Sequence, residues 1–466
     1  MYDLNIVLRS DIPKCLYEQI YEYVRQEIRE GKLLCEERLP STRSLAEFLQ
    51  VSRSTVELAY EQLASEGYIE SRPYKGYYVC RLEELYQLSQ PRETTVVSVP
   101  LEEKREYQVD FSPTAIDMSE FPFGVWKKIN KSILSDSNSR LFSSGSAQGD
   151  YSLRETISRY LHSSRGVNCK PEQIIVGAGN DYLLMLLEKI LGRHVSIAME
   201  NPTYKRAYQI FKSFAYPVET VDMDDNGMLV QQIGEEVKLV YVMPSRQYPT
   251  GTIMSAGRRS ELLKWAGGGA GRFIIEDDYD SEFRYKGKPI PSLQAMDKHG
   301  KVIYLGTFSK AIAPAIRVSY MVLPEILLKK YEAECSFYST TVSRIDQKIL
   351  EEFIKGGYFE RYLNKMRKHY REKHDLLLQE LEPFREQFEI SGENAGLHVL
   401  LKSKRKLTES ALLAASEQEE IKVYGLSGAL VDSKDSEERS TVILGYGGLS
   451  LDEIKLGIER LKKAWL

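Results

Sequence analysis

Short apolar runs that alternate with helix-like segments in the middle of the chain most constrain its fold. Strand-like runs lie at residues 173–176, 238–242, 272–275 and 302–305, with helix-like segments at 181–191 and 260–266. Parallel strands need long crossover connections, and helices in those crossovers cover both faces of the sheet. We therefore expect a mainly parallel α/β domain over residues 113–330, followed by a smaller α+β lobe over residues 331–466.

Composition narrows the class of protein. The 466 residues carry a net charge of −4 and are 42% hydrophobic, which is typical of a globular chain. The five cysteines are scattered without a C-x-x-C pair, and the six histidines show no metal-ligand spacing, so we predict free thiols and no metal. No stretch approaches 18 uncharged apolar residues, and the N-terminus lacks an apolar signal core. We expect a cytoplasmic protein with no membrane segment.

The N-terminal region shows helical patterns. Aliphatic side chains recur every fourth residue over residues 16–28, which predicts an amphipathic helix. Ser41 and Ser52 suit helix N-caps, and apolar residues follow each at helical spacing. Two short helices should therefore meet across a turn at residues 50–51, as in a helix-turn-helix.

A helix-turn-helix places the start of its second helix against base edges in the DNA major groove. Arg53, Ser54 and Thr55 would form that leading edge. Behind them, a polar turn with Arg72 and Lys75 separates two strand-like runs, which suits a wing that contacts phosphate.

Net charge leaves a second interpretation of this region open, in which the helices simply pack together. Residues 1–82 carry 11 Lys and Arg against 13 Asp and Glu, so the domain has no basic footprint as a whole. Yet the run LPSTRSLAEFLQVSRSTVELAYEQLASEGYIESRPYKGYYV closely resembles the winged helix-turn-helix of GntR-type bacterial repressors. The resemblance implies that Arg43 and Arg53 contact DNA. Residues 83–112, rich in Glu, Gln, Ser and Thr, are expected to be a linker.

Three polar clusters follow strand-like runs in the second half of the chain. In IIVGAGNDY, glycines lead into a helix near Asn180, whose backbone N–H groups could bind a phosphate. In FIIEDDYDSEF, Asp277 and Tyr279 are two residues apart and project to the same side. In VIYLGTFSKAIAPAIRVSY, Lys310 lies beside a strand end, where partial burial would favour the neutral amine that forms a Schiff base.

A fourth segment, ENPTYKRAY, presents an aromatic ring and a cation, Tyr204 and Arg206. Each piece alone is more often structural, because lysines are usually solvated and acids at a strand end usually form a turn. Together the four segments supply what pyridoxal 5'-phosphate (PLP) needs: a lysine for its aldehyde, a carboxylate, a phenol, a stacking ring and a phosphate site.

From Pro113 onwards the chain looks like a fold-type I aminotransferase. The resemblance implies that Lys310 carries the Schiff base, Asp277 pairs with the ring nitrogen, Tyr279 with the ring oxygen, and Tyr204 stacks on the ring. It also implies a phosphate site formed by Gly177, Ala178, Gly179, Asn180, Thr307, Ser309 and Arg317.

A GntR-like domain fused to this fold is the architecture of MocR/GabR-type transcriptional regulators, which the chain resembles from end to end. The resemblance implies a DNA operator, a head-to-tail, domain-swapped homodimer, and sensing of a small amine or amino-acid effector by transaldimination at Lys310. It assigns Arg206 to the effector carboxylate, whereas Gly428 stands where a second arginine is expected. Ile443 stands where aminotransferases commonly place the arginine that binds an α-carboxylate. GabR-type sensors respond to γ-aminobutyrate. Either Arg206 and Arg246 suffice to bind the effector carboxylate here, or the effector is not γ-aminobutyrate.

Three functions remain to be compared. We expect a regulator that is not primarily an enzyme, because the helix-turn-helix is intact and the carboxylate arginines are replaced. An active aminotransferase with an accessory DNA-binding domain is the alternative. A cofactor-free binding module is disfavoured by Lys310 and Asp277.

Overall fold

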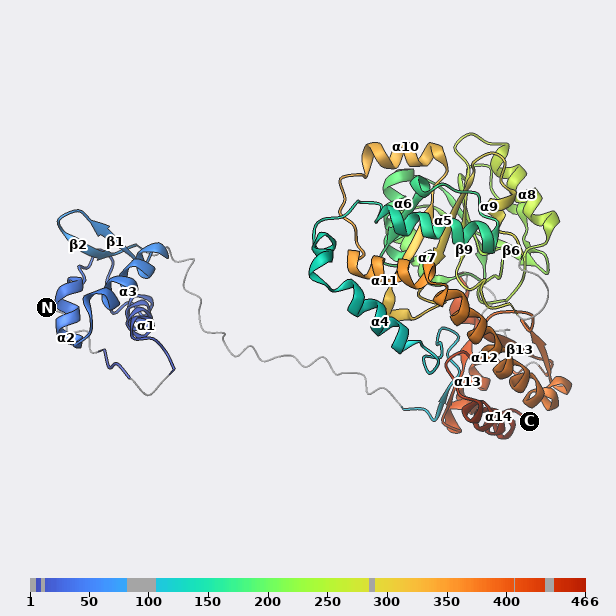
Figure 1. Ribbon diagram of the computed structural model, residues 1–466. Helices are drawn as coiled ribbons and strands as arrows, with labels where there is room; N and C mark the ends of the chain where they lie inside the picture. Colours follow the sequence, from blue (N-terminus) through green and yellow to red (C-terminus); the bar gives the residue numbers. More distant parts are fainter. Residues whose placement is uncertain (1–5, 10–12, 82–105, 285–289, 406, 432–439) are drawn as a thin grey trace. The chain divides into compact units, whose positions relative to one another are not determined.

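The computed structural model describes residues 6–9, 13–81, 106–284, 290–405, 407–431 and 440–466. The chain divides into two compact units, Met1–Lys104 and Arg105–Leu466 (Figure 1). Residues 83–105 of the expected linker lie outside the described residues. The boundary between the two units, at Lys104 and Arg105, falls at the end of this stretch.

The first unit is a winged helix-turn-helix, as predicted. Its elements are α1 (Leu16–Arg29), α2 (Thr42–Leu49), α3 (Arg53–Ser65), β1 (Ile69–Arg72) and β2 (Gly76–Val79). Both expected caps are formed, since Ser41 Oγ accepts from the Ser44 amide (3.1 Å) and Ser52 Oγ from the Thr55 amide (3.2 Å). Gln50 takes a left-handed conformation (φ +53°) that turns the chain between α2 and α3. The three helices and the antiparallel hairpin share one apolar core.

An eight-stranded sheet forms the centre of the second unit. Its strands are β4 (Ile174–Gly177), β5 (Ile197–Asn201), β6 (Val218–Asp224), β7 (Gly227–Met228), β8 (Leu239–Val242), β9 (Phe273–Asp278), β10 (Val302–Thr307) and β11 (Ser319–Val322). They lie in the order β4-β11-β10-β9-β8-β5-β6-β7, and only β11 and β7 pair antiparallel to their neighbours. The predicted mainly parallel sheet is confirmed.

Helices cover both faces of this sheet. They are α4 (Phe123–Ile133), α5 (Tyr151–Arg165), α6 (Asn180–Leu191), α7 (Lys205–Ser213), α8 (Ala256–Gly267), α9 (Leu293–Met296), α10 (Glu325–Glu334) and α11 (Arg344–Lys355). Apolar residues of α6, α7 and α10 pack on one face. Those of α5, α8 and α9 pack on the other, because strand residues alternate between the two faces.

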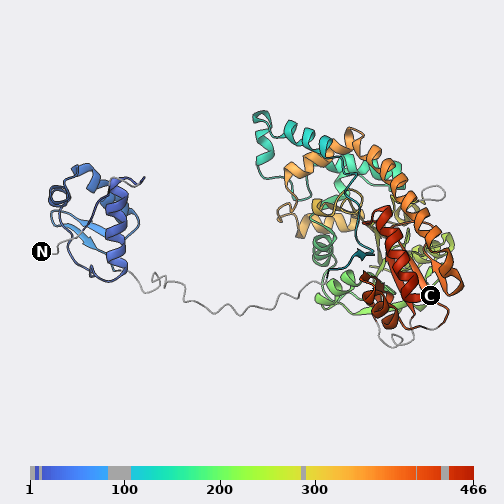
Figure 2. The same cartoon turned by 90° about the horizontal axis from the view of Figure 1, so that it is seen from below.

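The C-terminal lobe is α+β, as expected. It contains α12 (Tyr358–Glu380), β12 (Phe388–Ser391), β13 (His398–Ser403), α13 (Glu409–Gln418), β14 (Ile421–Lys422), β15 (Tyr424–Gly425), β16 (Thr441–Gly445) and α14 (Leu451–Trp465). Four of its strands form an antiparallel sheet in the order β12-β13-β16-β15. Figure 2 shows α12 (orange) and α14 (red) side by side on this lobe.

Two boundaries differ from those expected. Residues 106–112, assigned to the linker by their composition, belong to the second unit, where β3 (Val109–Asp110) pairs in parallel with β14. The expected boundary at residues 330–331 falls inside α10, which packs against α6 of the large lobe. In both places a contact with a distant part of the chain decides the boundary. No helix among the described residues combines the length and apolar character that crossing a bilayer demands.

Candidate functional site

The start of α3 presents the first set of predicted DNA contacts. Arg53 Nε pairs with Glu57 Oε1 one turn later (2.8 Å), and Arg43 Nε pairs with Glu47 Oε1 on α2 (3.1 Å). Both arginines are exposed and line one shallow groove together with Gln50. Exposed ion pairs of this kind stabilise a helix by at most about 1 kcal/mol. A DNA phosphate or base edge could therefore replace the glutamates at small cost.

Two hydroxyls lie beside Arg53 at the N-terminus of α3. Ser52 Oγ lies 2.8 Å from Ser54 Oγ and 2.7 Å from Thr55 Oγ1. The first turn of a helix carries backbone N–H groups without partners inside the helix, so this end suits an anion.

The wing differs from the open basic tip that its composition suggests. Arg72 is paired with Glu36 and Glu70, at 2.5 Å each, and its guanidinium lies over the ring of Tyr78. These carboxylates neutralise Arg72 locally, and Glu36 is far away in sequence. Lys75 remains exposed in the turn, next to the fully exposed ring of Tyr74.

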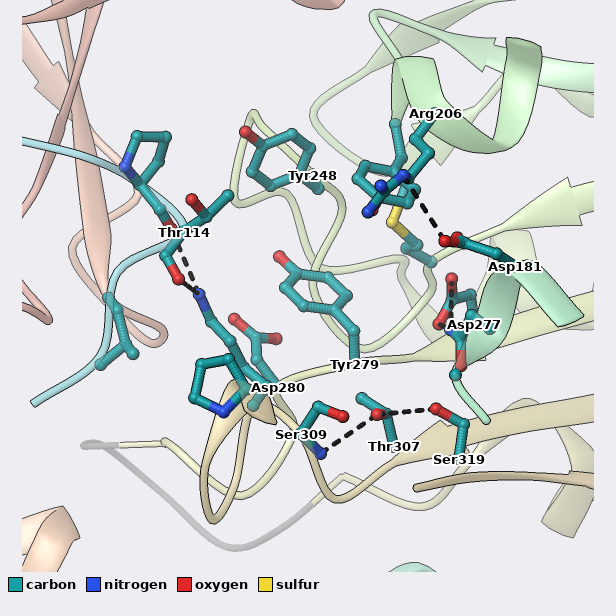
Figure 3. Close-up of a pocket in the computed structure, with 18 of the residues that line it drawn as sticks. Thr114, Asp181, Arg206, Tyr248, Asp277, Tyr279, Asp280, Thr307, Ser309 and Ser319 are labelled. Atoms are coloured by element: carbon teal, nitrogen blue, oxygen red, sulfur yellow. Dashed lines mark hydrogen bonds and ion pairs between the residues drawn. The ribbon is translucent and has the colours of Figure 1, made fainter. Parts of the chain in front are cut away.

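A cavity of about 400 Å³ lies in the second unit, where the carboxyl ends of β9 and β10 meet the start of α6 and the small lobe (Figure 3). It brings together most of the residues predicted from four separate segments. Those that line it are Gly179, Asn180, Tyr204, Arg206, Asp277, Tyr279, Thr307, Ser309, Lys310 and Arg317. Such a crevice outside the carboxyl ends of parallel strands is where open α/β sheets bind ligands.

Lys310 follows β10 and reaches across the cavity. Its Nζ donates to the carbonyl oxygens of Thr114 (3.0 Å) and Pro113 (3.3 Å). Burial lowers the pKa of Lys310 to about 8, although the nearby carboxylate of Asp280 opposes the shift. The amine is therefore neutral in an appreciable fraction near neutral pH, as a nucleophile requires.

Asp277 is the buried carboxylate of the cavity. The hydroxyl of Tyr241 on β8 donates to its Oδ2 (2.5 Å), and Asn180 Nδ2 lies 3.3 and 3.4 Å from its two oxygens. Burial raises the pKa of Asp277 to about 6, and these two donors counteract that rise. The next residue, Asp278, points to the opposite face of the sheet and pairs with Arg165 (2.7 Å). Strand alternation thus selects Asp277 for the cavity.

Aromatic rings form one wall of the cavity. Tyr248 packs edge-on against Tyr204 (5.9 Å between centroids) and Tyr279 (6.2 Å), and also against His398 (5.6 Å). Figure 3 shows the Tyr279 ring between Thr114 and Asp277, with Tyr248 above it. Tyr248 and His398 were not predicted, because a single aromatic residue or histidine carries no local signal.

Some of the residues expected to bind a phosphate lie together at one end of the cavity lining, and two do not line it. Gly179 has a φ of +96°, and a Cβ there would lie 2.4 Å from an Arg317 guanidinium nitrogen, so only glycine allows this approach. Thr307 Oγ1 accepts from the Ser309 amide (3.2 Å), whereas the buried Ser309 Oγ has no hydrogen-bond partner among the described residues. Gly177 and Ala178 do not line the cavity. Gly177 ends β4, and its α-carbon faces the Tyr182 and Leu183 side chains instead.

Arg206 lies at the rim of the cavity. It is 59% exposed, and its Nε lies 3.7 Å from Asp181 Oδ2, which also lies 3.5 Å from Arg317 Nη2. Asp181 therefore holds two cations of the cavity, and it raises the pKa of Arg206. Its place directly after Asn180 was the available signal, but sequence reasoning did not use it.

Arg246, the second predicted effector arginine, does not line the cavity. Its buried guanidinium donates to Asp280 Oδ2 (3.0 Å), to the Tyr279 hydroxyl (3.1 Å) and to the His398 carbonyl oxygen (3.1 Å). These partners come from β13 and from the loop after β9. Arg246 therefore supports the cavity wall from behind.

The structure also describes the two positions, Gly428 and Ile443, at which the resemblance leads us to expect arginines. Gly428 has open space around its α-carbon, and Ile443 is buried in β16. Neither position supplies a cation. Within the described ranges, no cluster of three or more His, Cys, Asp or Glu is arranged to hold a metal ion.

The cavity lining fits PLP chemically. It offers an amine of lowered pKa in Lys310, a carboxylate in Asp277, phenols in Tyr204 and Tyr279, a buried Ser309 hydroxyl with no partner among the described residues, and the Arg317 guanidinium. These are the groups that the aldehyde, the ring nitrogen, the ring oxygen and the phosphate require.

Comparison with known proteins agrees with both halves of the chain. The family described as "Bacterial regulatory proteins, gntR family" matches residues 16–79, and "Aminotransferase class I and II" matches residues 115–436. The HTH-type transcriptional regulator YdeL of Bacillus subtilis is 42% identical over 98% of this chain and 97% of its own length. The probable rhizopine catabolism regulatory protein MocR of Rhizobium meliloti is 31% identical over 99% of this chain and 96% of its own.

This chain belongs to the MocR-type transcriptional regulators. A solved relative of the second unit is the kynurenine aminotransferase of Pyrococcus horikoshii, determined in complex with PMP. It is 25% identical, covers 82% of this chain and 96% of its own, and has a TM-score of 0.69. The MocR-type regulator thus combines a GntR-type DNA-binding domain with a fold-type I aminotransferase domain, as the sequence predicts.

Proposed function

We propose that this MocR-type regulator holds PLP at Lys310 and responds to a small amine or amino acid that takes the place of the lysine amine. The observation that carries the proposal is the convergence of Lys310 and Asp277 in one cavity of a chain that also has a DNA-binding domain. When bound, PLP supplies an aldehyde carbon that exchanges between primary amines.

Each proposed contact to PLP rests on the position of a side chain in the cavity. Asp277, kept ionised by Tyr241 and Asn180, would pair with the ring nitrogen. Tyr279 would donate to the ring oxygen, and Tyr204 would stack on the ring. The backbone at Gly179 and Asn180, with Thr307, Ser309 and Arg317, would bind the phosphate.

The effector is proposed to bear no more than one carboxylate. Apart from Lys310 and Arg317, Arg206 is the cation that the described residues contribute to the cavity lining. Arg246 is already neutralised by Asp280. Loss of a charge-assisted pair with a second arginine removes about 1.5–3 kcal/mol of binding, which disfavours dicarboxylates and ordinary α-amino acids.

On the DNA side, Arg43 and Arg53 are proposed to contact a double-stranded operator, with Ser54 and Thr55 at the leading edge of α3 and Lys75 at a phosphate. Arg72 joins them only if DNA displaces its glutamates. A head-to-tail, domain-swapped homodimer is proposed to bring two DNA-binding domains to one operator. Exposed apolar side chains on the second unit, among them Phe123 of α4 and Leu134 directly after it, support contact with a second copy.

A working aminotransferase is the second candidate, because the cavity retains Lys310 and Asp277 and the aminotransferase family matches the domain. Its test is turnover with a keto acid acceptor. Sustained product formation from an amino acid would make catalysis the main role.

The proposal is tested by adding primary amines one at a time to the purified, PLP-loaded protein. We propose β-alanine, γ-aminobutyrate, taurine, ethanolamine and L-alanine, with visible absorption and operator affinity measured in parallel. The expected result is an amine that changes both signals without release of a keto product. No spectral response to any amine, including a reactive aminooxy compound, would overturn it.

A further inference from the structure

We call residues 106–121 the lead segment. It begins within the expected linker, residues 83–112, and its Pro113 and Thr114 line the cavity. At its start, β3 pairs with β14, and the Phe111 amide donates to the Lys422 carbonyl oxygen (2.9 Å). The Gly445 amide in turn donates to the Phe111 carbonyl oxygen (2.9 Å). The start of the lead segment is therefore part of the small lobe.

Glycines let the next residues lie directly on the small lobe. A Cβ at Gly445 would lie 2.2 Å from the Ser112 carbonyl oxygen, and one at Gly447 would lie 2.6 Å from the Ala115 carbonyl oxygen. Side chains at these positions would push the segment away from the lobe. The backbone of residues 112–115 is thus in close contact with the end of β16.

Asp117 fixes the segment a second time, now to α12. Its Oδ2 accepts from Lys373 Nζ (2.5 Å) and His369 Nε2 (2.8 Å), and its amide donates to the Tyr370 hydroxyl (3.2 Å). Lys373 is only 1% exposed. Burial alone would raise the pKa of Asp117, but the donors from Lys373 and His369 hold it well below its usual range. Asp117 and His369 are partly exposed, so Lys373 is the buried member of this cluster.

Between these two anchors, the lead segment meets the large lobe through Lys310. Figure 3 shows the dashed bonds from the lysine nitrogen to the segment at Thr114. Two donated hydrogen bonds, to the Pro113 and Thr114 carbonyl oxygens, require a lysine nitrogen that carries hydrogens. A lysine nitrogen doubly bonded to carbon has at most one, so this bridge between the lobes is complete only when Lys310 is released.

We propose that release of the Lys310 amine is the regulatory event, because the free amine then donates hydrogen bonds to the Pro113 and Thr114 carbonyl oxygens. Asp117 is the positioning residue: it fixes the lead segment to α12, so that the small lobe moves with the segment. The inference rests on the proposed function and specifies its regulation. In the exchange, the effector nitrogen takes over the double bond to the cofactor carbon. The two hydrogens that it gives up pass to the Lys310 nitrogen, which leaves as a free amine, so no oxidant or reductant is needed. The lead segment is continuous in sequence with the chain that leads to the DNA-binding domain. A change in the position of the segment can therefore alter DNA binding.

The test uses aminooxyacetate, which has an amine-like nitrogen and one carboxylate and removes the aldehyde from lysine stably. Full-length, PLP-loaded wild type, the double variant Asp117→Asn/Lys373→Met and His369→Gln are compared. The double variant removes both charges together, so neither is left buried without its partner. Glu120→Gln is the matched control, because Glu120 pairs with Lys365 on the same segment and the same helix but at the surface.

In wild type and Glu120→Gln, aminooxyacetate should change visible absorption and shift operator affinity by about fivefold or more, as allosteric coupling typically does. In the double variant the absorption change should persist while the shift in operator affinity falls below about twofold. His369→Gln, which keeps the ion pair, should give an intermediate shift.

Each other outcome has a defined meaning. An unchanged affinity shift in the double variant would overturn the role of Asp117, as would loss of the absorption change, which would show that Asp117 only maintains the cavity. If wild type itself gives no absorption change, the proposed function fails first, and the relay fails with it.

Discussion

Replacing Tyr241 by Phe tests how the cavity keeps Asp277 ionised. A hydrogen bond to a charged group contributes about 1.5–3 kcal/mol, and one pKa unit corresponds to about 1.4 kcal/mol. Tyr241→Phe should therefore raise the pKa of Asp277 by about one to two units, from about 6 to above 7. Since the ring nitrogen of PLP needs an ionised partner, PLP affinity at pH 7 should fall by about twofold to tenfold, in proportion to the ionised fraction of Asp277.

The assay is PLP affinity measured against pH. A carboxyl whose pKa is about 6 loses its charge as the pH falls through that value, so wild-type affinity should decline below pH 6. In Tyr241→Phe the decline should begin at least about one pH unit higher. Tyr216→Phe is the matched control, because this buried hydroxyl donates to the Gly192 carbonyl oxygen (2.6 Å) and does not line the cavity. Identical pH profiles for Tyr241→Phe and wild type would refute the reasoning.

Three other variants test separate parts of the account. Arg53→Ala should weaken operator binding and reduce the slope of log affinity against log salt by about one, with PLP content unchanged; an unaltered operator affinity would remove Arg53 from the interface. Lys310→Ala should abolish borohydride-dependent attachment of PLP while the protein still binds operator, and PLP fixed elsewhere by mass spectrometry would contradict the assignment. Arg206→Ala should weaken β-alanine by about tenfold and ethanolamine hardly at all; equal losses for both would exclude a carboxylate contact.

Local pattern was enough to predict most of the fold. The caps at Ser41 and Ser52 and the alternation along β9 each depend on a few neighbouring residues, and both appear as expected. Alternation also explains why Asp277 rather than Asp278 faces the cavity. These features depend on backbone geometry that short stretches of sequence determine.

Partners that come from distant segments could not be predicted. Tyr241 is one apolar-looking residue of a buried strand, and only strand order places its hydroxyl on Asp277. Arg72 and Arg246 were assigned to ligands by charge, whereas Glu36 and Asp280 already pair with them. Residues 106–112 have the composition of a linker, but Val109 and Phe111 are buried. In each case a long-range contact decides the role.

The central claim is that chemistry at Lys310 and DNA binding report on one event. It is tested most directly by titrating the PLP-loaded, full-length protein with aminooxyacetate while visible absorption and the fluorescence anisotropy of a labelled operator are recorded in the same cuvette. The account predicts that both signals change with the same half-saturation concentration in the wild type and that the operator response is absent in Lys310→Ala. An absorption change that saturates while the operator anisotropy stays constant would contradict it.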